Sequence, residues 1–202
     1  AITPLGNTPD QFWKHLLEGK SGIGPMTLCD STDYPCHIAG EVKDFDPAQY
    51  VGTRESRRMA RFSQLAVAAA LSSVESARLN MNKEDPYRVG VILGNGNGGF
   101  PELESNCRIL TEKGGMRMSP FFFPMVLPNM AAANVGHYVG AKGFNSTAST
   151  ACAASNQAIG EALMAIRRGN IDVALAGGTE AGINKTVIGS NNLFMSYTHV
   201  AH

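Results

Sequence analysis

The chain contains 202 residues, of which 44% are hydrophobic and 17% are charged, and its seventeen basic residues balance seventeen acidic ones. This composition is typical of a globular protein with a buried core and excludes a disordered chain. The lack of excess charge argues against nucleic acid or a membrane surface as a partner. Because no apolar run is long enough to span a bilayer and no signal peptide is recognisable, we expect a cytoplasmic protein.

Four cysteines, Cys29, Cys36, Cys107 and Cys152, are available for a metal site or a disulfide. Their spacing includes neither a CxxC pair nor a paired-histidine pattern, which argues against zinc. A disulfide between Cys29 and Cys36 is one alternative, but four cysteines in a chain of this length are more typical of reduced cytosolic thiols. We therefore predict free thiols and no bound cofactor.

A helix is predicted near the start of the chain. Thr8 is suited to an N-cap, Pro9 to the first helical position, and Gln11 completes a capping box. Gly19 is expected to end this helix, because glycine is favoured just beyond a helix C-terminus. The apolar face of the helix consists of Phe12, Trp13, Leu16 and Leu17.

Residues 22–52 show no sustained period and are predicted to form an irregular connection with a short strand near residues 38–42. Apolar residues at helical spacing then predict a long helix over residues 56–79. We interpret the basic group at its start as a solvated helix face; the alternative is a docking patch for an acidic partner. This group consists of Arg54, Arg57, Arg58 and Arg61.

Residues 89–93 form a short, wholly apolar run that predicts a strand covered on both faces. A glycine-rich loop over residues 94–99 and a helix over residues 101–113 are expected to follow. Residues 116–128 hold three phenylalanines among three prolines, which exclude a regular helix there. This apolar loop must be buried, either within the domain or as a subunit interface or hydrophobic ligand tunnel.

The last part of the sequence predicts a β-α-β unit. A helix of small residues over 129–139, ended by Gly140, precedes it. A strand over residues 144–151, a helix over 153–168 and a strand over 171–176 make up the unit. Such a unit implies parallel strands joined by a right-handed crossover.

Cys152 lies at the predicted junction between strand and helix, and all of its neighbours are small. A nucleophile on a sharp strand-to-helix turn needs small flanking residues so that the backbone turns tightly and exposes the sulfur. The N-terminal end of the helix favours the thiolate, and the Cys152 amide is placed to donate to an oxyanion. The alternative is a buried structural cysteine, and the residues alone leave both open.

Several sequence blocks resemble the β-ketoacyl-[acyl-carrier-protein] synthases, the condensing enzymes of fatty acid and polyketide assembly, in their synthase II-like form. The blocks are residues 3–8, 19–23, 124–130, 149–162, 167–169 and 176–180. The resemblance implies an α/β, thiolase-like fold with αβαβα layers in the complete enzyme. This chain is expected to cover mainly the N-terminal half. Residues 1–202 would then be an N-terminal ketosynthase domain that is truncated at both ends.

The resemblance also implies a reaction and its partners. Cys152 would take an acyl chain from acyl-carrier protein, and decarboxylation of malonyl-carrier protein would supply a carbanion that attacks the thioester. A homodimer is expected. The family needs two histidines and a lysine from its C-terminal half, so this chain alone should at most be acylated. None of the histidines here, His15, His37, His137, His199 and His202, matches a catalytic position of the family.

Two departures from the family concern its acyl pocket. Asn97 stands where the family often has an apolar residue, and residues 190–192 are polar where it usually has glycine and phenylalanine. These replacements weaken the expectation of long-chain acyl specificity.

Three other functions compete with a condensing enzyme. Gly94, Gly96 and Gly99 fit GxGxxG, as in a dinucleotide-binding oxidoreductase, but no acidic residue follows about twenty positions later. A thiolase-like acyltransferase would carry its cysteine block closer to the N-terminus. A non-condensing partner subunit, such as a chain-length factor, typically lacks the cysteine.

Overall fold

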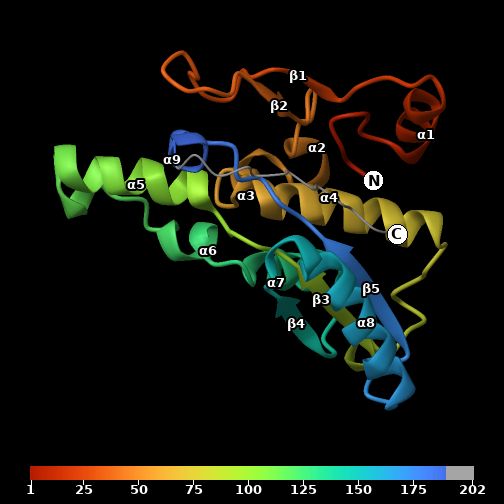
Figure 1. The fold of residues 1–202 in the computed structure, drawn as a ribbon. Coiled ribbons are helices and arrows are strands. Elements are labelled where there is room, and N and C mark those ends of the chain that lie inside the picture. The colour runs from red at the N-terminus through yellow and green to blue at the C-terminus, as the bar shows by residue number, and fades with distance from the viewer. Residues whose placement is uncertain (190–202) are drawn as a thin grey trace.

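The architecture of the chain is taken from a computed structural model that describes residues 1–189 (Figure 1). Its centre is a parallel sheet of three strands in the order β4-β3-β5. The strands are β3 (Val89–Gly94), β4 (Asn145–Ala148) and β5 (Val173–Gly178). Their register pairs Val91 with Asn145 on one side of β3 and Val89 with Val173 on the other.

Both faces of the sheet are covered by helices, and every residue of β3 is buried. Val89, Val91 and Leu93 point to one face, where they pack against α4 (Arg61–Ser76) and α7 (Met130–Val139). Ile92 points to the other face and packs against alanines of α8 (Ala154–Arg167). The prediction of a doubly covered strand at residues 89–93 is confirmed.

The predicted β-α-β unit is present as β4, α8 and β5, and its strands are parallel. The two strands are not neighbours, because β3 lies between them. Their predicted bounds were wrong by a few residues: β4 stops at Ala148, and β5 begins at Val173. The chain leaves β4 early because Ala151 adopts a left-handed backbone with φ of 48°, which no strand accommodates.

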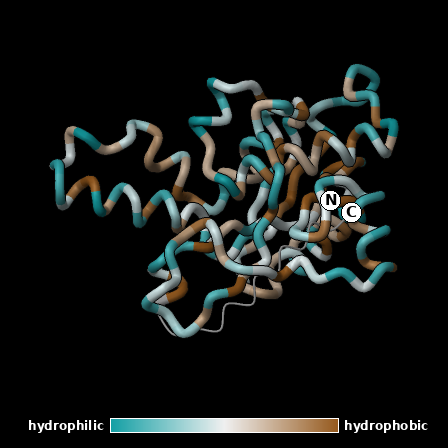
Figure 2. The backbone as a smooth tube through the Cα atoms, turned by 90° about the horizontal axis from the view of Figure 1, so that it is seen from above, coloured by the Kyte–Doolittle hydropathy of each residue, from teal (hydrophilic) through white to brown (hydrophobic). Residues whose placement is uncertain are grey.

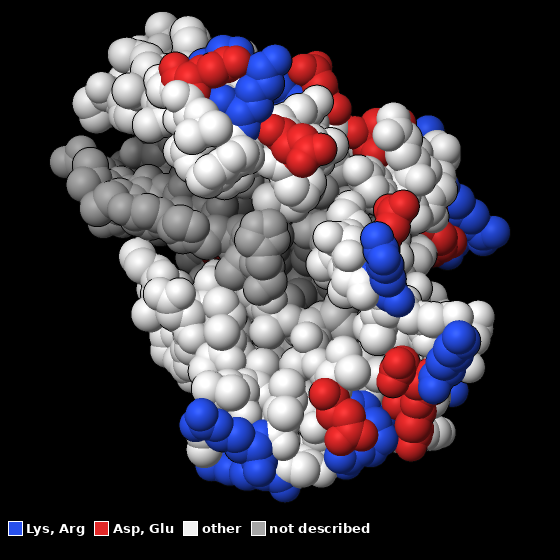
Figure 3. All heavy atoms as spheres, turned by 90° about the vertical axis from the view of Figure 1, so that its right-hand side faces the viewer, with Lys and Arg blue, Asp and Glu red and all other residues white. Residues whose placement is uncertain are grey.

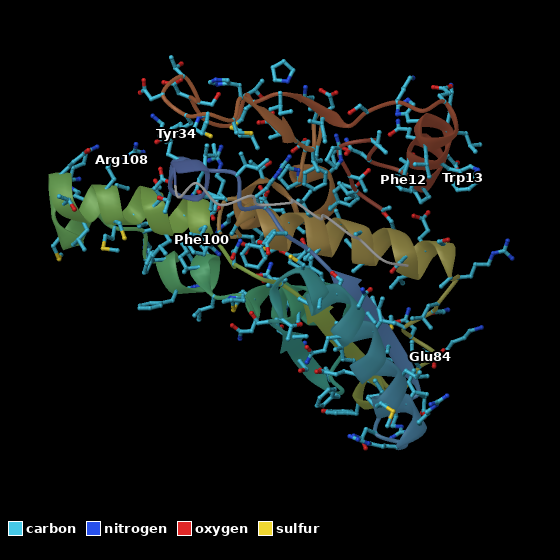
Figure 4. The ribbon with its side chains drawn as sticks, in the orientation of Figure 1. Phe12, Trp13, Tyr34, Glu84, Phe100 and Arg108 are labelled. Carbon is cyan, nitrogen blue, oxygen red and sulfur yellow. The ribbon has the colours of Figure 1, made fainter. Side chains whose placement is uncertain are left out.

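Helix α1 (Pro9–Leu17) begins where the capping pattern predicts, but Gln11 reaches back to Asn7 and not to the N-cap residue, so the predicted capping box is only half formed. Thr8 Oγ1 accepts a hydrogen bond from the Gln11 N–H at 3.2 Å, and Gln11 Oε1 accepts one from the Asn7 N–H at 3.1 Å. None of the residues of α1 is buried. The side chain of Trp13 is 59% exposed and that of Leu17 is 70% exposed, so the predicted apolar face lies at the surface of the described chain (Figure 4).

The predicted irregular connection contains a hairpin in which β1 (Ile23–Pro25) pairs antiparallel with β2 (Ile38–Gly40). The sequence indicated only the second strand. Glu41 is buried just after β2, and its carboxylate accepts hydrogen bonds from the N–H groups of Thr27 and Leu28 at 2.8 and 2.9 Å. Burial raises the pKa of Glu41, but a hydrogen bond from the Thr27 hydroxyl at 2.6 Å, together with these two N–H bonds, outweighs it and leaves the pKa below its usual value.

The long helix predicted over residues 56–79 was wrong at both ends. One-turn helices α2 (Ala48–Val51) and α3 (Thr53–Ser56) come first, and α4 begins only at Arg61. The break is stabilised by the Gln64 side chain, which donates to the carbonyl oxygens of Ser56 at 2.8 Å and of Met59 at 3.1 Å. The Ser56 carbonyl also accepts a bond from the Met59 N–H at 3.3 Å, and the Gln64 side chain adds the donors that a break between helices leaves missing.

The four arginines around this break do not form one solvated face. Arg61 is half-buried over the ring of Phe45 and donates to the carbonyl oxygens of Val42 and Phe45, so the prediction was wrong for this residue. Arg58 lies over the ring of Phe121 and pairs with Glu55. Only Arg54 and Arg57 are exposed.

Helix α5 (Phe100–Lys113) confirms the predicted helix and projects from the body of the molecule (Figures 1 and 2). The prolines that follow do not exclude α6 (Phe122–Val126), a single turn in which Pro124 occupies an early position that needs no N–H. Phe123 is 68% exposed and Leu127 is 43% exposed. Packing within the described residues therefore buries this apolar segment only in part.

The remaining elements are short. They are η1 (Pro86–Arg88), η2 (Gly115–Arg117), η3 (Ala151–Ala153) and α9 (Lys185–Gly189). Charges of both signs are interspersed on the face shown in Figure 3. No helix among residues 1–189 has the length and apolar character needed to cross a membrane.

Candidate active site around Cys152

Cys152 lies in a tight turn between the end of β4 and the start of α8. The turn passes through Ala151, whose φ of 48° is uncommon for a residue with a side chain and carries backbone strain. A single 3-10 turn, η3, contains Cys152 and leads into the helix. The predicted strand–turn–helix junction is confirmed, and because the Cys152 side chain is exposed in the described chain, the alternative of a buried cysteine was wrong.

Two glycines allow the N-terminus of α8 to rest directly on the sheet. A Cβ atom at Gly94 would lie 2.3 Å from the carbonyl carbon of Ala154, and one at Gly178 would lie 2.8 Å from Cβ of Ser155. Both distances are shorter than any contact between a real Cβ and another heavy atom. Glycine is therefore required at the ends of β3 and β5, and the helix holds the cysteine above the carboxyl ends of the strands, where parallel sheets bind ligands.

Asn95 connects the loop after β3 to the segment after β5. This fully buried side chain donates from Nδ2 to the Thr179 carbonyl at 2.7 Å and accepts at Oδ1 from the Gly98 N–H at 2.6 Å. Thr179 in turn donates through Oγ1 to the Phe62 carbonyl at 2.7 Å. These buried polar groups are all paired, which fixes this end of the sheet to α4.

Glu180 holds the glycine-rich loop from the other side. Its Oε2 atom accepts hydrogen bonds from the N–H groups of Gly96 at 2.9 Å and Asn97 at 3.1 Å. Burial raises the pKa of the Glu180 carboxyl, against the opposing effect of the N–H groups that it binds. Sequence reasoning included Glu180 only within a block of resemblance; an acid two residues after the end of a strand was the signal for its separate role.

The same loop does not offer free amides to a phosphate. The N–H groups of Gly96 and Asn97 bind Glu180, that of Gly98 binds Asn95, and that of Gly99 donates to the Val126 carbonyl at 3.0 Å. A dinucleotide-binding loop needs such groups free to cradle the pyrophosphate. The GxGxxG pattern therefore has a structural explanation here.

The described histidines have partners other than Cys152. Nδ1 of His15 lies 2.5 Å from the Leu5 carbonyl oxygen, and His37 lies near Ser31. His137 is exposed on α7, with its ring edge-on to Tyr138. Two further histidines and the polar segment at residues 190–192 lie outside the described residues.

All four cysteines are free thiols. Within residues 1–189, no three His, Cys, Asp or Glu side chains are grouped in a way that would hold a metal ion.

Comparison with known proteins decides the family. A family model described as the N-terminal domain of β-ketoacyl synthases matches residues 1–196. The chain belongs to the β-ketoacyl synthase family. This membership confirms the resemblance recognised in the sequence and removes the dinucleotide-binding alternative.

Curated relatives of this family member include 3-oxoacyl-[acyl-carrier-protein] synthase 2 of Synechocystis sp., which is 44% identical over 183 residues. That match covers 91% of the chain and 44% of the relative. The enzyme of the same name from Staphylococcus aureus is 41% identical over 188 residues, covering 93% of the chain and 47% of the relative. The chain thus spans about half the length of the curated relatives it matches.

Solved structures confirm the fold as that of the N-terminal half of a ketosynthase. One is a type II polyketide synthase acyl-carrier protein in complex with its ketosynthase, at 27% identity and a TM-score of 0.80 over 94% of this chain and 51% of that one. Another is the ishigamide ketosynthase/chain length factor, at 25% identity and a TM-score of 0.84, over 94% of this chain and 47% of that one. The predicted α/β, thiolase-like class is confirmed.

Proposed function

We propose that this chain is the N-terminal part of a β-ketoacyl-[acyl-carrier-protein] synthase in which Cys152 accepts the acyl group. The observation that carries the proposal is the exposed Cys152 thiol on a strained turn at the N-terminus of α8, close to the carboxyl ends of the strands. Family membership and the relatives named synthase 2 support it.

The first step would be thioester exchange. The Cys152 thiolate attacks the carbonyl carbon of the acyl thioester, the carrier thiol leaves, and the acyl chain becomes bound to Cys152. The positive end of α8 and the backbone N–H of Cys152 are suited to stabilise the oxyanion of the tetrahedral intermediate. Each of these roles depends on the tight packing of the helix onto the sheet.

The second step would be decarboxylative condensation. Malonyl-carrier protein loses carbon dioxide, and the resulting carbanion attacks the Cys152 thioester to release a 3-ketoacyl product and the free thiolate. None of the contacts of His15, His37 or His137 involves Cys152. We expect this chain by itself to yield no 3-ketoacyl product, and detection of that product by mass spectrometry would contradict the expectation.

Acyl-carrier protein is the proposed partner. The exposed side chains of Arg54 and Arg57 are suited to an acidic surface such as carrier proteins often present. A second copy of the chain is proposed to cover the exposed apolar side chains of Phe123 and Leu127, giving a homodimer. A relative solved as a carrier-protein complex supports the first of these proposals.

Intact-mass measurement with acyl-carrier protein as donor tests the nucleophile. Full-length protein should gain the mass of one acyl group, and Cys152→Ala should gain none. Cys107→Ala is the matched control, because Cys107 is also an exposed free thiol but lies on α5. Acyl transfer that survives in Cys152→Ala, or that is lost in Cys107→Ala, would rule out Cys152 as the acceptor.

A further inference from the structure

Glu180 is connected to the Cys152 turn through a single glycine. Its Oε2 atom binds the N–H of Gly96, and a Cβ atom at Gly96 would lie 3.0 Å from that oxygen and 3.7 Å from Cα of Ala151. Gly96 therefore lies next to both the carboxyl group and the strained residue that precedes Cys152. Ser149 Oγ also donates a long hydrogen bond of 3.5 Å to the Gly96 carbonyl oxygen.

The carboxyl group is the acceptor for two consecutive amides. The N–H groups of Gly96 and Asn97 point at the same oxygen, so loss of the Glu180 side chain would leave two partly buried donors without a partner. An unpaired buried donor carries a desolvation penalty, and the loop would move to relieve it. Because Ser149 is hydrogen-bonded to Gly96 and a Cβ atom at Gly96 would lie only 3.7 Å from Cα of Ala151, such a movement would reach the turn that presents the thiol.

The second oxygen of Glu180 is not explained by the fold. Oε1 is buried and has no partner at hydrogen-bonding geometry among the described residues, although the nearby Ala181 N–H helps to lower the pKa of this carboxyl. Burial of an incompletely paired carboxylate is costly. Burial therefore raises the pKa of Glu180, which favours the neutral form of the carboxyl group. An amide would satisfy the loop equally well, with its oxygen toward the two N–H groups and its NH₂ at the place of Oε1.

We propose that Glu180 is a positioning residue for acyl transfer: its carboxyl group fixes Gly96 and Asn97, and through them the backbone of Ala151 that presents Cys152. The inference deepens the proposed function and rests on Cys152 being the acyl acceptor. Glu180 acts here as an acceptor for backbone N–H groups and not as a charge. Glutamine at this position should therefore preserve acyl transfer, whereas alanine should not.

Two reactions of Cys152 distinguish a loss of correct positioning from a general loss of structure around the thiol. Acyl transfer from acyl-carrier protein needs the thiol and its backbone donor in register, whereas alkylation by iodoacetamide needs only an accessible thiolate. In full-length protein, Glu180→Ala should slow acyl transfer about tenfold or more and alkylation by no more than about twofold. Glu180→Gln should keep acyl transfer within about threefold of the wild-type rate.

Glu104 provides a matched control. Its carboxylate likewise binds a backbone N–H and a hydroxyl, those of Thr186 at 3.0 Å, but in α9 and not in the loop beside the turn. Glu104→Ala should change both rates by less than about twofold. If Glu180→Ala does not fold, as judged by thermal unfolding, Gly96→Ala takes its place, because its Cβ would crowd Oε2 and should give the same separation of the two rates.

Several outcomes would overturn the role of Glu180. They are an acyl-transfer rate in Glu180→Ala close to that of the wild type, equal losses of both reactions, or a Glu180→Gln rate as low as that of Glu180→Ala. Failure of the wild-type protein to become acylated at Cys152 is a separate result, because it would overturn the proposed function itself.

Discussion

At the end of the sheet where the strands begin, Arg88 pairs with Asp172 and donates to the carbonyl oxygens of Gly169 and Asn170 at 2.7 and 3.1 Å. At the end where the strands finish, the buried Asn95 and the half-buried Glu180 bind backbone groups. The first end is held by solvated charges and the second by groups with little access to water, so we expect the second end to tolerate substitution less. The less tolerant end is the one that carries Cys152.

Crowding at the buried end should have the largest effect. Gly94→Ala would place a Cβ atom 2.3 Å from a backbone atom of α8. A backbone atom cannot move aside by changing a side-chain rotamer, so the whole helix would have to shift. We expect a loss of about 3 kcal/mol or more in the free energy of unfolding, measured by urea denaturation. Gly160→Ala is the control on α8 itself: nothing lies within 4 Å of its Cβ position, so stability should hold or rise by up to about 1 kcal/mol.

Loss of the Asn95 side chain should rank second. Asn95→Leu removes the partners of the Thr179 carbonyl and the Gly98 N–H while keeping a similar volume, and should cost about 2–3 kcal/mol of unfolding free energy. Asn129→Ala should cost less than about 0.5 kcal/mol in the same measurement, because Asn129 is exposed and its side chain makes no capping bond to α7. If the two variants lost the same unfolding free energy, burial of Asn95 would not be what makes it important.

The two ends should respond to pH in opposite directions. Burial raises the folded-state pKa of Glu180, so its contribution to stability should fall as pH rises from the unfolded value, near 4.5, through the folded one. The hydrogen bond from Arg88 lowers the folded-state pKa of Asp172, so its contribution should be lost as pH falls below the unfolded value, near 3.8. The free energy of unfolding should be measured as a function of pH. Glu180→Gln should abolish the decrease in stability as pH rises above about 4.5, and Asp172→Asn should abolish the decrease as pH falls below about 3.8.

The smallest effect is expected at the charged end. Arg88→Met should lower the melting temperature slightly, and this difference should shrink at high salt because exposed ion pairs are screened. A decrease in melting temperature as large as that of Asn95→Leu, or one that salt leaves unchanged, would show that the charged end of the sheet tolerates substitution no better than the buried end.

Local patterns predicted the elements whose signals are local. The apolar run at residues 89–93 and the capping residues around Thr8 were sufficient for β3 and the start of α1. The break before α4 was missed because it depends on the Gln64 side chain reaching back to carbonyls that helical periodicity does not register. Exposure of the α1 face was also not predictable, because amphipathic spacing shows which side is apolar but not what covers it.

The candidate site divides in the same way. Cys152 was predictable because small flanking residues and the start of a helix are adjacent in sequence. The contacts of Glu180 with Gly96 and Asn97 join segments more than eighty residues apart, and no periodic pattern encodes them. Gly94 and Gly178 were visible only as glycines, since the need for them arises from the approach of α8 to the sheet.

The order of the strands also has a consequence for synthesis on the ribosome. β3 is central to the sheet but is made first, and both of its partners follow later in the chain. At ordinary translation rates, its apolar side chains wait about 3–10 s for β4 to emerge. α4 has already been made and shares one hydrophobic core with Val89 and Val91 in the finished fold. We therefore expect α4 to shield one face of the nascent strand from aggregation while the other waits for α8.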